Sequence, residues 1–198
     1  MPKRIVFTGP ESTGKSQLSE KLALKLKAHH VPEFAREYLA GRERKRSLSD
    51  HQAGLQGITS FVPHHTSYGI EDLKNIEEGQ KFLENQAYRF DNQIVIQDTD
   101  FLTIWIWYGY KYGQSPKRVI DYLSDHLPDL YLLCYPDLPW TPDPQRENPN
   151  DRMTLFDCHL LEIEDLDVPY AVIKGYGDRR VQNVLDALEK NGLHDFKS

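Results

Sequence analysis

Cysteine is scarce in this sequence of 198 residues, which limits the kinds of protein it can be. The two cysteines, Cys134 and Cys158, form no Cys-x-x-Cys pair, so we expect no disulfide framework and a reducing compartment, the cytoplasm. The eight histidines include the adjacent pairs at 29–30 and 64–65, and none has a spacing that places two ring nitrogens on one metal ion. We therefore predict no zinc site.

Long apolar runs and an excess of positive charge are also missing. The longest apolar stretches, such as 104–108, are far shorter than the ~20 residues of a spanning helix, and the N-terminal segment turns polar at Thr8 without a signal-peptide core. We expect no membrane partner. Lys and Arg total 24 against 30 Asp and Glu, a net charge of −6, which is unfavourable for binding nucleic acid through its phosphates.

What is present fits one globular domain over 1–198, with 39% hydrophobic and 11% aromatic residues. Short apolar runs at 4–8, 93–97, 130–134 and 170–174 predict buried parallel strands. Leu18, Leu22 and Leu26 recur with a helical period, as do apolar residues between 181 and 188. Strands that alternate with helices predict an α/β fold, a parallel sheet with helices on both faces.

The strongest motif lies between the first predicted strand and the first predicted helix. It matches the phosphate-binding loop G-x-x-x-x-G-K-[S/T] and consists of Gly9, Pro10, Glu11, Ser12, Thr13, Gly14, Lys15 and Ser16. Its glycines allow backbone N–H groups to turn inward around an anion, Lys15 supplies a charge for the phosphates, and Ser16 is a ligand for Mg²⁺. We predict ATP and Mg²⁺ as cofactors, with Gln17 beside the nucleotide.

Carboxylates follow two predicted strands. Asp98 ends the strand at 93–97, where it would contact Mg²⁺ directly or through water, and Asp100 could face the acceptor of the phosphoryl group. Either aspartate could instead cap the next helix. Glu33 is the candidate base or orienting group for the acceptor hydroxyl, and Glu37 could share its helix face. A surface glutamate at a helix start is the alternative for Glu33.

The segment at 136–150 holds five of the twelve prolines and cannot be a continuous helix, so we predict a loop or lid over about 136–155. Arg146 and Arg152 flank it and could stabilise the transferred phosphoryl group when the lid closes; surface ion pairs are the alternative. The segment at 41–70 stays unassigned, and its basic run at 42–46 is typical of a solvated helix face. The aromatic residues after Asp100 are expected mainly in the core, although one or two could stack on a base.

Several segments together resemble a known family. They are 9–16, 32–38, Asp98 to Asp100 with Trp107 and 110–113, and 168–170 with Gly175, Tyr176 and Arg179. In this order they are similar to the ribosylnicotinamide kinase domain of NadR-type proteins, a P-loop family that phosphorylates the 5′-hydroxyl of nicotinamide riboside. The resemblance covers most of the chain. It implies a three-layer P-loop NTPase sandwich of the nucleoside/nucleotide kinase type with a lid.

The resemblance also implies roles for individual residues. Lid arginines would approach the phosphates, and Tyr176 would lie near adenine. The residues facing the riboside would be Glu33, Arg36, Tyr38, Asp100 and Trp107. Residues 43–66 depart from the family pattern near the acceptor side. The larger NadR-type proteins carry adenylyltransferase and DNA-binding domains, and we expect neither activity from these 198 residues.

The sequence thus predicts a kinase that transfers the γ-phosphoryl group of ATP to nicotinamide riboside, giving nicotinamide mononucleotide. A kinase for another nucleoside or a nucleoside monophosphate is the first alternative. An ATP-hydrolysing regulatory ATPase is the second, although no guanine-reading motif follows the strand at 130–134. A non-catalytic scaffold is disfavoured because Lys15, Ser16 and Asp98 are all present.

Overall fold

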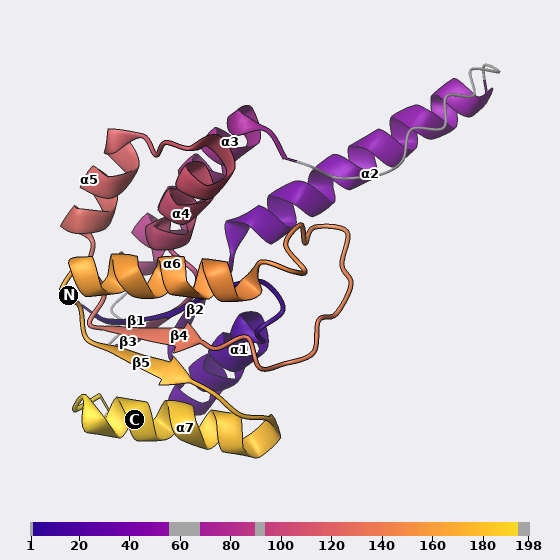
Figure 1. The fold of residues 1–198 in the computed structure, drawn as a ribbon. Helices are drawn as coiled ribbons and strands as arrows, with labels where there is room; N and C mark the ends of the chain where they lie inside the picture. The colour runs from indigo at the N-terminus through magenta and orange to yellow at the C-terminus, as the bar shows by residue number, and fades with distance from the viewer. Residues whose placement is uncertain (1, 56–67, 90–93, 194–198) are drawn as a thin grey trace.

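Five parallel strands form one sheet at the centre of the protein (Figure 1). The computed structural model describes residues 2–55, 68–89 and 94–193, and side chains over the same ranges except 45–55. The strands are β1 (Lys3–Thr8), β2 (His29–Val31), β3 (Ile94–Asp98), β4 (Leu130–Cys134) and β5 (Tyr170–Ile173). Their order is β2-β3-β1-β4-β5, and every pairing is parallel. The predicted α/β fold is confirmed, with strand ends within one residue of those expected.

Helices cover both faces of the sheet. They are α1 (Lys15–Leu26), α2 (Phe34–Leu55), α3 (Ile70–Ala87), α4 (Phe101–Tyr112), α5 (Lys117–Asp125), α6 (Arg152–Asp165) and α7 (Gly177–Lys190). Helices α1 and α7 lie on one face, and α3 to α6 lie on the other (Figure 1). The far part of α2 extends away from the rest of the molecule in the same view.

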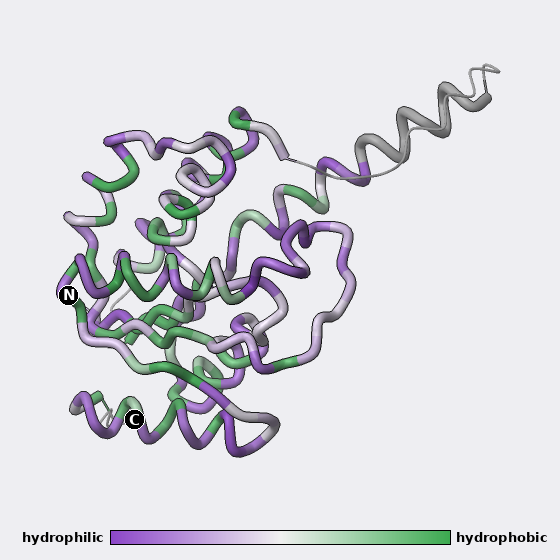
Figure 2. Tube along the Cα trace, in the orientation of Figure 1, coloured by the Kyte–Doolittle hydropathy of each residue, from purple (hydrophilic) through white to green (hydrophobic). Residues whose placement is uncertain are grey.

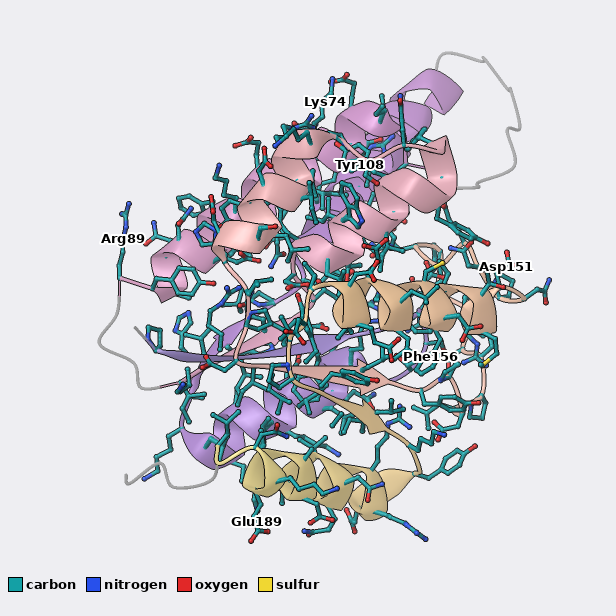
Figure 3. All side chains as sticks on the ribbon, turned by 60° about the vertical axis from the view of Figure 1, so that its left-hand side comes forward. Lys74, Arg89, Tyr108, Asp151, Phe156 and Glu189 are labelled. Carbon is teal, nitrogen blue, oxygen red and sulfur yellow. The ribbon has the colours of Figure 1, made fainter. Side chains whose placement is uncertain are left out.

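Alternation along the strands divides the core into two layers. In β1, Ile5 and Phe7 pack with α1 and α7, whereas Val6 packs with the helices of the opposite face. All three side chains are fully buried, as expected for a parallel strand covered on both sides. Figure 2 shows the hydrophobic residues gathered on the strands. Tyr108, labelled in Figure 3, belongs to the core layer on the face covered by α3 to α6.

The carboxyl end of β1 lies where the connections diverge. Strand β1 pairs with β3 on one side and with β4 on the other. The chain leaves β3 and β4 toward different helices. The register sets Phe7 opposite Asp98 in β3 and opposite Leu132 in β4. In open α/β sheets a ligand-binding crevice forms at this kind of switch point. The predicted phosphate-binding loop begins there.

Two segments that the sequence left irregular now have defined parts. Helix α2 continues through the basic run and ends at Leu55. Within the basic run, Arg42 is paired with Asp72 of α3 at 2.5 Å. Residues 56–67 lie outside the described ranges. Residues 135–151 contain no helix or strand, as predicted. Helix α6 begins at Arg152, within the lid predicted at about 136–155.

A buried polar cluster joins the sheet to α3. The guanidinium of Arg4 donates to Gln97 Oε1 at 2.8 and 3.0 Å and lies 3.9 Å from the Glu84 carboxylate. The Tyr122 hydroxyl donates to the same carboxylate oxygen, Glu84 Oε2, at 3.3 Å. Burial raises the pKa of Glu84 to about 7, although Arg4 opposes this change. The folded protein therefore holds a proton on Glu84 that the unfolded chain releases at lower pH.

This raised pKa predicts a pH-dependent stability. Because Glu84 titrates near 4.5 when unfolded and about 7 when folded, its contribution is complete below pH 4.5 and is lost as pH rises through 7. The difference amounts to roughly 3 kcal/mol. We expect Glu84→Gln to be more stable than the parent protein at pH 8, with a flatter dependence of Tm on pH between 5 and 8. Glu78→Gln, at an exposed position of the same helix, is the matched control. An equal loss of stability at every pH for Glu84→Gln would contradict the prediction.

Candidate functional site

The loop at 9–16 has the backbone of an anion-binding nest. Gly9, Ser12 and Gly14 have φ angles of 124°, 57° and 77°, which alternate with ordinary values along the loop. A Cβ on Gly9 would lie 2.8 Å from the carbonyl oxygen of Cys134, so glycine is required there. Thr13 Oγ1 donates to Pro10 O at 2.8 Å and holds the turn. The loop leads into the N-terminus of α1, where free N–H groups and the helix dipole favour an anion.

Lys15 is held over this loop. Its Nζ donates to Gly9 O and Pro10 O, each at 2.9 Å. Among the described residues no carboxylate lies within ion-pair distance of Nζ. The charge of Lys15 is therefore available to an incoming anion.

Asp98 supplies an uncompensated carboxylate beside the loop. It ends β3 and is 2% exposed, and its Oδ1 has no hydrogen-bond partner among the described residues. A buried anionic oxygen without a partner is costly unless a cation approaches it. Ser16 and Asp98 form the oxygen donor set that Mg²⁺ prefers, so both the orphaned atom and the chemistry fit this ion. In the described part of the chain no cluster of three or more His, Cys, Asp or Glu residues is placed to hold a metal ion.

Glu33 lies at the corner between β2 and α2. Its side chain is 14% exposed and lies 3.4 Å from Arg36 Nε. Burial and the nearby Asp98 raise the pKa of Glu33 to about 7, against the opposing effects of Lys15 and Arg36. A carboxyl group with such a pKa can accept a proton near neutral pH.

Helix α3 fixes the corner that carries Glu33. The Phe34 N–H donates to Gln80 Oε1 at 3.0 Å. The Phe34 ring packs directly on Gly79, where a Cβ would lie 2.0 Å from a ring carbon. Gly79 and Gln80 thus set the path of the backbone next to Glu33.

The proline-rich segment is tied to both sides of the loop. Its Thr141 N–H donates to Ser12 Oγ at 2.9 Å, and its Asn148 N–H donates to Glu11 Oε2 at 3.1 Å. On the other side Asp143 lies 3.4 Å from Arg36, and Lys111 of α4 pairs with Glu147 at 2.8 Å. We call residues 135–151 the lid because they bridge these groups.

The two predicted lid arginines take different positions. Arg146 lines the cavity and lies 3.4 Å from Ser12 Oγ. Arg152 instead donates to Leu138 O at 2.8 Å and to Ser12 O at 3.5 Å, so it ties the lid to the loop. Each guanidinium lies 5.9 Å from the ring centre of Trp140.

A cavity of about 600 Å³ connects the loop with the space under the lid, within the usual size of small-molecule sites. Predicted residues that line it are Gly9, Pro10, Glu11, Ser12, Thr13, Gly14, Lys15, Ser16, Gln17, Glu33, Arg36, Trp107 and Arg146. Its wall also includes residues that sequence reasoning did not select, among them Tyr68, Thr103, Leu155 and His159. In the sequence each could equally be a core residue, so no local pattern distinguished them as cavity residues.

Five expected site residues are not among those that line the cavity: Asp98 and Arg152, described above, and Tyr38, Asp100 and Tyr176. Asp100 accepts from the Leu102 N–H at 3.1 Å and from the Tyr131 hydroxyl at 2.6 Å, so its carboxylate caps α4, and burial raises its pKa to about 6. It does not line the cavity, which corrects the expectation that it faces the acceptor. The Tyr38 hydroxyl is bonded to Asp72 of α3 at 2.9 Å, also away from the cavity wall.

Tyr176 is the N-cap residue of α7, and Arg180 lies in the first turn of this helix. Tyr176 is exposed, outside the cavity wall, and its hydroxyl donates to Asp137 O. Arg180 is only 3% exposed and donates to Thr13 O and Tyr135 O, both at 3.0 Å. Sequence reasoning assigned no role to Arg180; only its neighbour Arg179 was noted, as part of the family resemblance.

A family model described as AAA domain matches residues 4–180. No curated protein matches the sequence. Among solved structures, a NadR protein in complex with NAD and AMP-PNP is 19% identical, with a TM-score of 0.69. It is matched over 100% of this chain and 51% of its own, so the present chain spans about half of that protein. A NadR protein in complex with NR has a TM-score of 0.67 at 19% identity, with coverage of 100% and 52%.

Thymidylate kinase from Candida albicans is also similar, with 16% identity, coverage of 98% and 94%, and a TM-score of 0.63. At these identities the likeness establishes the fold, which is that of P-loop kinases. Over the described ranges, none of the helices combines the length and apolar character that crossing a membrane requires.

The contact of Phe34 with Gly79 predicts the effect of one added methyl group. We expect Gly79→Ala to lose about 1–3 kcal/mol of stability, because the ring must move, even though alanine favours helices. Gly41→Ala, where a Cβ would meet nothing within 4 Å, should be neutral or slightly stabilising. Urea denaturation of both variants measures the difference. Equal stability of the two variants would show that the contact is unimportant.

Proposed function

The chain belongs to the AAA domain family, and from this premise we propose that it is an ATP-dependent kinase for the 5′-hydroxyl of nicotinamide riboside. Nicotinamide mononucleotide would be the product. The observation that carries the proposal is one cavity that joins the anion-binding loop to a half-buried carboxyl group beneath a lid. Within these 198 residues we propose a single kinase domain, with the lid at 135–151.

The nucleotide half of the cavity is suited to a triphosphate. Lys15 has no carboxylate partner among the described residues, and Arg146 of the lid lines the same space. Arg152 and Arg180 act as positioning residues, since they bond carbonyl oxygens of the loop at Ser12 and Thr13. Oriented backbone dipoles and cations of this kind stabilise developing charge on a phosphoryl group.

The acceptor half favours a neutral or cationic nucleoside over a phosphorylated one. Its polar groups include the Glu33 carboxyl, and its aromatic groups include Trp107 and Tyr68, with ring centres 5.8 Å apart. Among the described residues, Arg36 is the cationic side chain of the cavity wall near Glu33. It is paired with Glu33 and Asp143. A nucleoside monophosphate would need an unpaired cation for its phosphate. The similar fold solved with NR supports the same class of acceptor.

In the proposed reaction the riboside hydroxyl oxygen forms a bond to the γ-phosphorus of ATP. The bond from that phosphorus to the bridging oxygen breaks, ADP leaves, and the hydroxyl proton passes to the Glu33 carboxylate. Lys15 and Arg146 stabilise the charge on the transferred group. Lid contacts exclude water, which would otherwise compete with the hydroxyl.

Ser16 and Asp98 are the residues that would hold Mg²⁺. The ion, when bound, neutralises charge on the phosphates of the nucleotide. Asp98 is suited to this role by its buried, unpartnered Oδ1.

The proposal is tested by ADP release with Mg·ATP in the presence of nicotinamide riboside, other nucleosides and nucleoside monophosphates. We expect strong stimulation by the riboside, with nicotinamide mononucleotide identified by mass spectrometry. Turnover only with another acceptor would retain the kinase but reject the riboside. ADP release that ignores every acceptor would favour the alternative of a regulatory ATPase.

Lys15→Ala should lower riboside phosphorylation by at least about a hundredfold, because a cation aimed at the transferred group is removed. Its Tm should stay close to that of the parent protein, since the lysine bonds only loop carbonyls. Lys21→Ala, on the exposed face of α1, serves as the control. Near-normal turnover by Lys15→Ala would refute the proposed role of the loop.

The pKa of Glu33 predicts a pH profile. Because this carboxyl must be ionised to accept the proton, kcat/KM for the riboside should rise with pH through about 7 and then level off. Glu33→Gln should lose this limb and lower kcat, while binding of ATP is retained. A pH profile unchanged by Glu33→Gln would assign the proton to another group.

A further inference from the structure

His159 is a buried polar residue of the cavity wall that the proposed reaction does not use. It lies on α6, three residues beyond Phe156, which lies between this helix and the sheet (Figure 3). The residue is 2% exposed, yet it lines the cavity together with Thr103, Trp107 and Leu155. It therefore lies in the part of the wall formed by α4 and α6, within the electrostatic reach of Lys15.

Hydrogen bonding fixes the tautomer of the His159 ring. Nδ1 lies 2.7 Å from Leu155 O, one helical turn earlier. A carbonyl oxygen only accepts, so Nδ1 carries the proton and donates it. In the neutral ring Nε2 is then an acceptor, and this atom has no partner among the described residues. Buried polar atoms are nearly always bonded, so an unpaired one on a residue that lines a cavity is a candidate for a ligand contact.

The surroundings of the ring keep it neutral. Burial lowers the pKa of His159 to about 4, and the charge of Lys15 acts in the same direction, against the bond to Leu155. At neutral pH the side chain thus presents a lone pair and no charge. A lone pair repels phosphate oxygens and carboxylates and attracts O–H and N–H groups.

We propose that His159 Nε2 accepts a hydrogen bond from an O–H or N–H donor of the nucleoside acceptor and thereby selects for acceptors that carry this donor. The inference rests on the proposed function, because it assigns a contact within the same cavity. Two donors have this chemistry, a ribose hydroxyl and the carboxamide N–H of nicotinamide. Loss of the donor that bonds Nε2 should matter only while His159 is present.

The experiment compares the parent protein with His159→Leu, which fills the space without an acceptor, and His159→Gln, which retains an acceptor oxygen. Acceptors are nicotinamide riboside, its 2′- and 3′-deoxy analogues, and nicotinic acid riboside, whose carboxylate has no N–H. We expect kcat/KM of His159→Leu for the riboside to fall at least tenfold, mainly through KM, with KM for ATP unchanged. His159→Gln should recover part of this loss.

The analogues identify the donor. The parent protein should discriminate against the one analogue that lacks the bonded group, and His159→Leu should lose this discrimination. Without ligand, His159→Leu should have a Tm equal to or above that of the parent, because an unpaired buried atom is removed. A residue needed only for packing would lower Tm and affect all acceptors equally.

His126→Leu is the matched control. His126 makes the same kind of bond, from Nδ1 to Tyr122 O at 2.8 Å, but it does not line the cavity. It should change neither KM nor the analogue ratios. Identical analogue ratios for the parent and His159→Leu would overturn the inference.

Failure of the proposed function gives a different result. If the parent protein does not phosphorylate the riboside but phosphorylates another nucleoside, the same variants are compared on that nucleoside and its deoxy analogues. The His159 inference is then supported if His159→Leu loses the parent's discrimination between them, and overturned if the kcat/KM ratios are identical. ADP release that responds to no acceptor would overturn both.

Discussion

Parallel pairing of β1 with β3 and β4 is the constraint on which the site depends. Because all three strands run in the same direction, their carboxyl ends meet at one edge of the sheet. The register brings the anion-binding loop after β1 next to Asp98 of β3. A slip of one residue would turn Asp98 to the opposite face of the sheet and exchange its place with a core side chain. Burial on both faces of β1 makes such a slip unfavourable, so the apolar core also fixes the geometry of the polar site.

The loop itself is held by groups that come from distant parts of the chain. Arg180 reaches Thr13 O from α7, and Arg152 reaches Ser12 O from α6. Both bond backbone carbonyls, which leaves the N–H groups of the loop available to an anion. Rigid support of this kind keeps the dipoles oriented before a ligand arrives, which is the condition for electrostatic preorganisation.

Local patterns were sufficient to predict four of the five strands and the phosphate-binding loop; the three-residue strand β2 was too short to give such a pattern. Strands such as β4 are continuous apolar runs, and the glycines and lysine of the loop have fixed spacing, so each is defined within a few residues. The acceptor side was harder to predict because its wall is assembled by tertiary packing. Tyr68, Thr103 and His159 come from three separate segments, and each resembles a core residue in its own helix or turn. For Asp100 the local pattern was ambiguous, because an aspartate two residues after a strand suits either a ligand or a helix cap. In the structure it is a cap, and the Tyr131 hydroxyl, from a distant strand, also bonds its carboxylate.

The lid has contacts on both halves of the cavity, and this has a thermodynamic consequence. It meets Glu11 and Ser12 on the nucleotide side and Arg36 and Lys111 on the acceptor side. A ligand that shifts the lid on one side changes the free energy of its contacts on the other. Linkage then requires the effect to be reciprocal, so that each ligand alters the affinity for the other by the same factor. In the proposed kinase the lid would thereby couple the nucleotide subsite to the acceptor subsite.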